Sequence, residues 1–169
     1  MNKRTRDLAL FNLGIDAKLR ACDLLNLKVS DVWSGSEVYK QSTVVQRKTG
    51  VSVTFEITDA SRFALVAWIE RSQLNGPSYL FNSRNSKSAR LSMSQYTRII
   101  KDLAADIGLD STKYATHSIR RTKVSIIYRE TQDVRACQVL LGHKKIENTV
   151  RYLGLELDDA LKISRGIDI

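Results

Sequence analysis

The chain has 169 residues, 43% of them hydrophobic, which is enough for one domain with a real core. Its 27 basic and 18 acidic side chains leave a net charge of +9, which favours a polyanionic partner. No run approaches the roughly 18 consecutive apolar residues of a membrane span, and the start lacks the apolar stretch of a signal peptide. We therefore expect a soluble, cytoplasmic protein without a membrane partner.

In the first part of the chain, helical spacing of apolar residues predicts two short helices between residues 4 and 29, broken near residues 14–16. From residue 37 to 57 the composition shifts to Val, Tyr, Thr and Phe, with strict apolar and polar alternation over 51–57. This pattern predicts a small antiparallel sheet, with Lys48-Thr49-Gly50 as its hairpin turn. Thr58 is expected to cap a helix that ends near residues 73–77, and Asn82 to Arg90 is expected to be a loop.

The remainder of the chain reads as helices: one stopped at Gly108, then about 116–130, 133–141 and 146–153, and a tail over 156–165. No repeat or linker divides the chain. We predict one α+β domain over residues 1–169 that is mostly α-helical with one small sheet.

Most of the excess charge is local. Between residues 113 and 151 the chain has nine basic and three acidic side chains, so this segment supplies six of the nine net charges. Such a segment favours a polyanion such as DNA, with binding that weakens steeply with salt, although a solvated helix face would show the same composition.

The same segment holds residues suited to a phosphodiester. Both histidines of the chain are there, His117 and His143, and Tyr152 follows His143 by nine positions. His117 and Arg120 share one helix face, and an arginine fork can grip two phosphate oxygens. Histidine can donate to phosphate or move a proton, and a tyrosine hydroxyl can act as the nucleophile.

Two upstream residues complete this set. Arg20 would add a second guanidinium, and Lys48 at the hairpin tip could protonate a leaving oxygen. Each residue also has a structural interpretation, because Arg20 could pair with Asp23, Lys48 could be a plain turn residue and Tyr152 could belong to the core. The joint pattern, and no single member, carries the hypothesis.

In this pattern the chain resembles the tyrosine recombinase (integrase) family. The blocks occur in that family's order: Leu19-Arg20-Ala21-Cys22-Asp23-Leu24-Leu25-Asn26-Leu27-Lys28, Lys48-Thr49-Gly50, His117-Ser118-Ile119-Arg120-Arg121-Thr122, Leu141-Gly142-His143, Thr149 and Tyr152. The resemblance covers the chain from about Arg6 to Tyr152. It implies that family's catalytic-domain fold with a small three-stranded antiparallel sheet.

The resemblance also implies a function, that of a site-specific recombinase or integrase of a mobile element. Tyr152 would attack the scissile phosphate to form a 3′-phosphotyrosyl link, and the other catalytic residues would be Arg20, Lys48, His117, Arg120 and His143. Family members need no metal or cofactor. They usually act as tetramers on two synapsed DNA duplexes, with accessory DNA-bending proteins as further partners, and the segment after the tyrosine, here 156–169, commonly packs on a neighbouring protomer.

The chain also departs from the family. It starts almost at the helix before Arg20, so the usual N-terminal core-binding domain is expected to be absent, and Arg121 replaces a frequent histidine. A DNA-binding regulator or remnant that does not recombine, or a nicking activity like that of type IB topoisomerases, therefore stays open. Contacts to the DNA backbone are expected from Arg84, Lys87, Arg90, Arg121, Lys123, Lys144 and Lys145. The absence of H-E-x-x-H, paired cysteines, a P-loop and G-x-G-x-x-G argues against metal hydrolysis and nucleotide chemistry.

Overall fold

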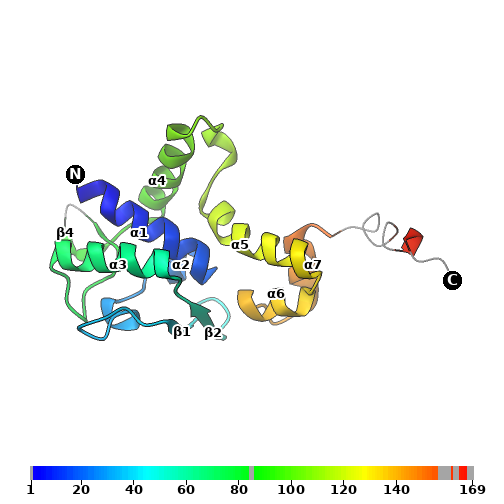
Figure 1. The fold of residues 1–169 in the computed structure, drawn as a ribbon, viewed down its shortest axis with the longest axis horizontal. Helices are drawn as coiled ribbons and strands as arrows, with labels where there is room; N and C mark the ends of the chain where they lie inside the picture. Colours follow the sequence, from blue (N-terminus) through cyan, green and yellow to red (C-terminus); the bar gives the residue numbers. More distant parts are fainter. Residues whose placement is uncertain (1, 84–85, 156–160, 162–163, 167–169) are drawn as a thin grey trace.

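A computed structural model describes residues 2–83, 86–155, 161 and 164–166 of the chain (Figure 1). The predicted tail over 156–169 therefore lies largely outside the described residues. The helices are α1 (Asn2–Ala17), α2 (Ala21–Leu24), α3 (Asp59–Ser72), α4 (Met93–Asp106), α5 (Thr116–Thr131), α6 (Val134–Leu141) and α7 (Ile146–Leu153), with short 3-10 turns η1 (Val29–Asp31) and η2 (Ser111–Lys113). The strands are β1 (Gln41–Val45), β2 (Ser52–Glu56), β3 (Asn82–Ser83) and β4 (Ser86–Arg90).

Two hydrophobic clusters hold these elements together. The larger one surrounds α1 and includes Leu13, Phe55 and Leu65, all at most 1% exposed. The smaller one contains Val124 and Leu141 and packs α6 and α7 against the second half of α5. Because α5 contributes to both clusters, it joins the body around α1 and α3 to the α6–α7 unit, as Figure 1 shows.

The first helix is longer than the sequence suggested. α1 runs through Gly14 to Ala17, and the chain turns at Lys18, which has a positive φ of 52°. A Cβ on Gly14 would lie 2.8 Å from Tyr96 Oη and 3.0 Å from Ile119 Cγ2. The predicted break at residues 14–16 is therefore wrong, because this glycine permits close packing of α4 and α5 against α1.

The hairpin around Lys48 is confirmed. β1 and β2 pair antiparallel with Val44 opposite Val53, and the residues between them form the turn. The prediction of three strands is wrong in number, because in the described part of the chain this sheet has two. Residues 33–38 make only one bridge, Trp33 to Val38, since Ser34 Oγ accepts from the backbone nitrogens of Ser36 and Glu37 and closes a tight turn.

The predicted loop from Asn82 to Arg90 is also corrected. β3 and β4 form a second antiparallel pair with Asn82 opposite Arg90. The segment is polar and lacks the alternation that identifies a half-buried strand, so the sequence carried no signal for it. In the described residues, no helix combines the length and the apolar character needed to cross a membrane.

Candidate active site

The carbonyl oxygen of Leu141 lies where three distant segments meet. It belongs to the last residue of α6, and Gly142 ends that helix with a φ of 65°. The final carbonyls of a helix have no partner within it and carry its partial negative charge. Here the carbonyl accepts from Gln46 Nε2 at 2.9 Å and from Arg120 Nη2 at 3.0 Å. The end of α6 thereby fixes a guanidinium and connects it to the β1–β2 hairpin.

Arg120 is held at a second point. Its side chain is buried, and Nε donates to Lys18 O at 2.8 Å across 102 positions of sequence. The left-handed turn at Lys18 supplies this carbonyl. Burial lowers the pKa of Arg120, with Arg20 acting in the same direction and Tyr152 against it, yet an arginine stays charged at any relevant pH. Two backbone carbonyls therefore fix the orientation of one buried positive charge.

Arg20 lies beside this guanidinium. It occupies the N-cap position of α2 in extended backbone, is half-buried, and donates from Nη1 to Gln46 Oε1. The expected alternative, a pair between Arg20 and Asp23, is not what the structure shows. Asp23 Oδ1 instead accepts from the backbone nitrogen of Arg47 at 3.0 Å, directly before Lys48.

His143 faces Tyr152 from the turn after α6. Its Nδ1 lies 3.0 Å from Thr149 Oγ1, and its ring meets the Tyr152 ring edge-on, with centroids 5.6 Å apart. Burial, followed by the positive charges of Arg120 and Arg20, lowers the pKa of His143 to about 4. The imidazole is therefore neutral at pH 7, and the hydroxyl of Thr149 holds the ring at Nδ1 in either tautomer, because it can donate or accept.

Tyr152 closes the cluster from the last turn of α7. The guanidinium carbons of Arg120 and Arg121 lie 5.7 Å and 6.0 Å from its ring centroid. Its hydroxyl is buried and has no hydrogen-bond partner among the described residues. Burial raises the pKa of Tyr152, while the charges of Arg120, Arg121 and Arg20 oppose that rise. A buried, unsatisfied hydroxyl costs about 1 to 3 kcal/mol, so such an atom calls for an explanation.

Two predicted catalytic residues lie at the edge of this cluster. Lys48 is exposed in the hairpin turn, two positions after Gln46. His117 is exposed on the first turn of α5, three positions before Arg120. Within the described ranges, no hydrogen bond, ion pair or ring contact joins either side chain to the cluster. The structure thus brings Arg20, Arg120, His143 and Tyr152 together and leaves Lys48 and His117 as neighbours of the group.

The predicted DNA contacts have different surroundings. Arg84 and the side chain of Lys87 lie outside the described residues, while Arg90, Lys144 and Lys145 are exposed. Arg121 is exposed but donates from Nη2 to Leu153 O at 3.2 Å, the last residue of α7.

Lys123 makes an ion pair within the chain that the sequence did not predict. Its ammonium lies 2.6 Å from Asp16 Oδ1, and the other oxygen of that buried carboxylate accepts from Thr58 and Ser61. Lys123 thus joins α5 to the ends of α1 and α3, and its charge is already paired. A contact with DNA remains a prediction for this residue.

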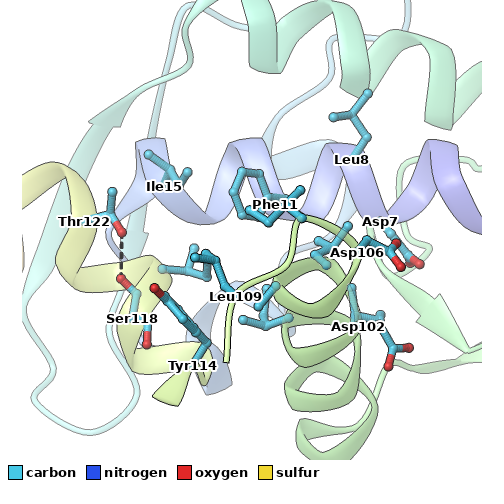
Figure 2. A pocket seen from close by; sticks show the side chains of 16 residues that line it. Asp7, Leu8, Phe11, Ile15, Asp102, Asp106, Leu109, Tyr114, Ser118 and Thr122 are labelled. Carbon is cyan, nitrogen blue, oxygen red and sulfur yellow. Dashed lines mark hydrogen bonds between the residues drawn. The ribbon is translucent and has the colours of Figure 1, made fainter. Parts of the chain in front are cut away.

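A separate pocket of about 810 Å³ lies on another side of α5 (Figure 2). Apolar side chains of α1 and α4, such as Phe11 and Leu103, form much of its wall, and α5 contributes Ser118, Ile119 and Thr122. None of the six predicted catalytic residues lines it, so consecutive residues of α5 face two different sites. The described residues contain no group of three or more His, Cys, Asp or Glu side chains that could hold a metal ion.

Comparison with known proteins decides what this arrangement belongs to. The family model described as the phage integrase family matches residues 1–157. The chain belongs to the phage integrase family. The resemblance seen in the sequence motifs is thereby confirmed.

Relatives within the integrase family differ in length. The probable integrase/recombinase YoeC of Bacillus subtilis (strain 168) is 29% identical over 170 residues, covering 99% of this chain and 89% of YoeC. The tyrosine recombinase XerC of Erythrobacter litoralis (strain HTCC2594) is 31% identical over 147 residues, covering 87% of this chain but 45% of XerC. The chain thus spans about half the length of that XerC.

A solved structure supports the fold. The crystal structure of the XerH site-specific recombinase bound to palindromic difH substrate, a post-cleavage complex, matches with a TM-score of 0.73 and 18% identity. The match covers 96% of this chain and 46% of XerH. The predicted fold class, a mostly helical α+β catalytic-domain fold of tyrosine recombinases, is confirmed.

Sequence reasoning about this integrase-family chain missed Gln46. Along β1 the inward positions are Ser42 and Val44, and Gln46 continues that face as a fully buried residue. The signal was therefore present, since a long polar side chain stood where alternation places an apolar one.

Proposed function

We propose that this chain is the catalytic domain of a tyrosine recombinase, which cleaves and rejoins DNA strands through a 3′-phosphotyrosyl intermediate. The observation that supports this most is the hydroxyl of Tyr152. It is buried beside Arg120, Arg121 and His143 and has no partner among the described residues. A scissile phosphate bound between these groups would explain the unsatisfied atom.

The chemistry assigned to the cluster needs no free tyrosinate. Ionising a tyrosine of pKa 10 in advance at pH 7 would cost about 4 kcal/mol. In the proposed step, Tyr152 Oη forms a bond to phosphorus while the bond from phosphorus to the 5′ oxygen breaks. His143 accepts the tyrosine proton, since a bound phosphate anion raises the pKa of a histidine beside it. Lys48 gives a proton to the departing 5′ oxygen, and the reverse step restores both protons.

The two guanidiniums stabilise the phosphate as it becomes five-coordinate. Arg120 is preorganised by Lys18 O and Leu141 O, so little reorganisation is required when charge develops on the non-bridging oxygens. Arg20 supplies the second fork, and His117, one helical turn before Arg120, is assigned a hydrogen bond to the phosphate.

Double-stranded DNA is the proposed partner. XerH, which shares the fold, has been solved bound to its difH substrate. The exposed basic residues Arg90, Lys144 and Lys145 are assigned to the DNA backbone, together with Arg84 and Lys87. A homotetramer on two synapsed duplexes, with accessory DNA-bending proteins, is proposed on the family resemblance alone, as is the packing of residues 156–169 on a neighbouring protomer.

A suicide substrate tests the assignment. The full chain is incubated with a pool of duplexes that carry a randomised site and a fixed nick, so that cleavage releases a short strand and traps the covalent adduct. Denaturing gels should show an adduct for the wild type that Tyr152→Phe abolishes. Tyr128→Phe is the matched control, because Tyr128 is a half-buried tyrosine that packs, like Tyr152, against the smaller hydrophobic cluster. The Tyr128→Phe variant should still form the adduct.

The outcomes separate the open alternatives. An adduct that survives Tyr152→Phe overturns the assigned nucleophile. DNA binding without any adduct identifies a regulator, and relaxation of supercoiled plasmid without exchange between duplexes identifies activity like that of a type IB topoisomerase.

A further inference from the structure

We propose that Gln46 is a positioning residue that couples Arg20 and Arg120 into one phosphate clamp, an inference that rests on the function proposed above. Gln46 is fully buried at the end of β1. Its Oε1 accepts from Arg20 Nη1 and from Thr49 Oγ1 at 3.1 Å, and its Nε2 donates to Leu141 O at 2.9 Å. The carbonyl that holds Gln46 also holds Arg120. A continuous chain of hydrogen bonds therefore joins the two guanidiniums.

The neighbours of the Gln46 side chain require both an acceptor oxygen and a donor nitrogen. Two donors face the oxygen, and a carbonyl, which can only accept, faces the nitrogen. A glutamate here would direct a carboxylate oxygen at the Leu141 carbonyl, and a methionine of similar length would satisfy none of the three groups. The polar contacts at position 46, and not the volume of the side chain, therefore require a glutamine.

A neutral acceptor also preserves the charge that a phosphate needs. A carboxylate on Arg20 would compete with the phosphate for the guanidinium, whereas an amide oxygen orients Arg20 and leaves its charge uncompensated. The nearby carboxylate of Asp23 is directed to the backbone nitrogen of Arg47 instead. Among the ion pairs of the described residues, none includes Arg20 or Arg120.

The space beside Gln46 fits this role. A Cβ on Gly142 would lie 2.9 Å from Gln46 Nε2 and 2.4 Å from Val53 Cγ2. The glycine of Leu141-Gly142-His143 thus leaves room for the amide at the point where α6 meets the hairpin. The same turn of chain then places His143 beside Tyr152.

The test is single-turnover cleavage by Gln46→Met, with a matched variant, Gln138→Met. Gln138 is also a buried glutamine that accepts from an arginine, Arg135, and donates to a backbone carbonyl, that of His143. Within the described residues, no hydrogen bond joins its side chain to Arg20 or Arg120. Both variants lose a comparable buried amide, so their stabilities in urea should fall by similar amounts.

Two DNA substrates, one with a phosphodiester and one with a methylphosphonate at the cleavage site, distinguish a positioning role of Gln46 from a merely structural one. On a phosphodiester, Gln46→Met should slow adduct formation about 10- to 100-fold at unchanged DNA affinity, because small misplacement of a clamp is costly. On a methylphosphonate, which lacks one charged non-bridging oxygen, the ratio of wild type to Gln46→Met should shrink toward unity. Gln138→Met should show the same ratio to the wild type on both substrates.

Each possible result either supports or overturns the proposed role of Gln46. A Gln46→Met rate within twofold of the wild type on the phosphodiester, or an equal loss on both substrates, overturns the role of Gln46. If Gln46→Met does not fold, Gln46→Glu replaces it, because its carboxylate still accepts from Arg20 and Thr49. It cannot donate to Leu141 O and it competes with the phosphate for Arg20, so the same selective loss is expected. Failure of the proposed function would differ, since the wild type itself would then form no adduct.

Discussion

Gly142→Ala should destabilise the chain far more than an equivalent substitution at another left-handed glycine. Gly142 has a φ of 65° at the end of α6, where an alanine costs about 1 to 2 kcal/mol in backbone strain. Its added Cβ would also lie 2.4 Å from Val53 Cγ2 and 2.9 Å from Gln46 Nε2. Relieving overlap of this kind in a packed interior costs about 1 to 3 kcal/mol more.

Gly108 provides the matched control. It lies two residues after the end of α4 with a φ of 77°, and a Cβ built there meets nothing within 4 Å. Gly108→Ala should therefore cost only the backbone strain, about 1 to 2 kcal/mol. The difference in unfolding free energy between the two variants measures the cost of the steric overlap where α6 meets the β1–β2 hairpin.

Urea denaturation measures this difference. With a slope of about 2 kcal/mol per molar urea, an extra loss of 2 kcal/mol moves the midpoint down by about 1 M relative to Gly108→Ala. Equal midpoints for the two variants would refute the reasoning, because the close approach of Gln46 and Val53 to Gly142 would then carry no cost.

Two further predictions concern charged groups. Burial would raise the pKa of Asp16, but hydrogen bonds from Lys123 and its other partners hold it below the ordinary value. Asp16→Asn should therefore cost about 2 kcal/mol in urea denaturation, because the carboxylate that it removes is only 6% exposed and pairs with Lys123 away from screening water. Asp59→Asn, at an exposed ion pair, should cost under about 0.5 kcal/mol, and equal losses would contradict the role of burial. The pKa of His143 is about 4 in the folded state, below the ordinary value of 6.5. As the pH falls, the unfolded chain therefore binds a proton at this residue before the folded chain does. The free energy of unfolding is highest above pH 6.5 and decreases toward pH 4. After a discount for solvent screening this loss is about 1 to 2 kcal/mol, and His143→Gln should remove it from the pH profile of the unfolding free energy.

The family could be predicted from the sequence because its motifs are short and lie in fixed order. Arg120, His143 and Tyr152 lie within 33 positions of each other, on or directly after helices whose apolar spacing could be recognised in the sequence. Their mutual approach, together with that of Arg20, is what the structure adds.

The supporting contacts could not be predicted, because they depend on pairings distant in sequence. Gln46 and Leu141 are 95 positions apart, and Arg120 and Lys18 are 102 positions apart. Lys18 and Leu141 contribute only their backbone carbonyls to these contacts, so their residue types give no signal. Lys123 shows a further limit: a net positive segment suggests DNA contacts, but charge counts cannot show that Asp16 pairs with this lysine in the folded chain.

The positive charges around Tyr152 are held by neutral dipoles. Arg120 donates to the last carbonyl of α6, its neighbour Arg121 to the last carbonyl of α7, and Arg20 to an amide. Each helix end favours a nearby cation by about 0.3 to 1 kcal/mol, which partly offsets the repulsion among the three guanidiniums. Carboxylates would stabilise the free chain more strongly, but they would also neutralise the field that a phosphate must meet. The arrangement therefore fixes the direction of three arginines and leaves their charge uncompensated, as the proposed binding of a phosphate at this site requires.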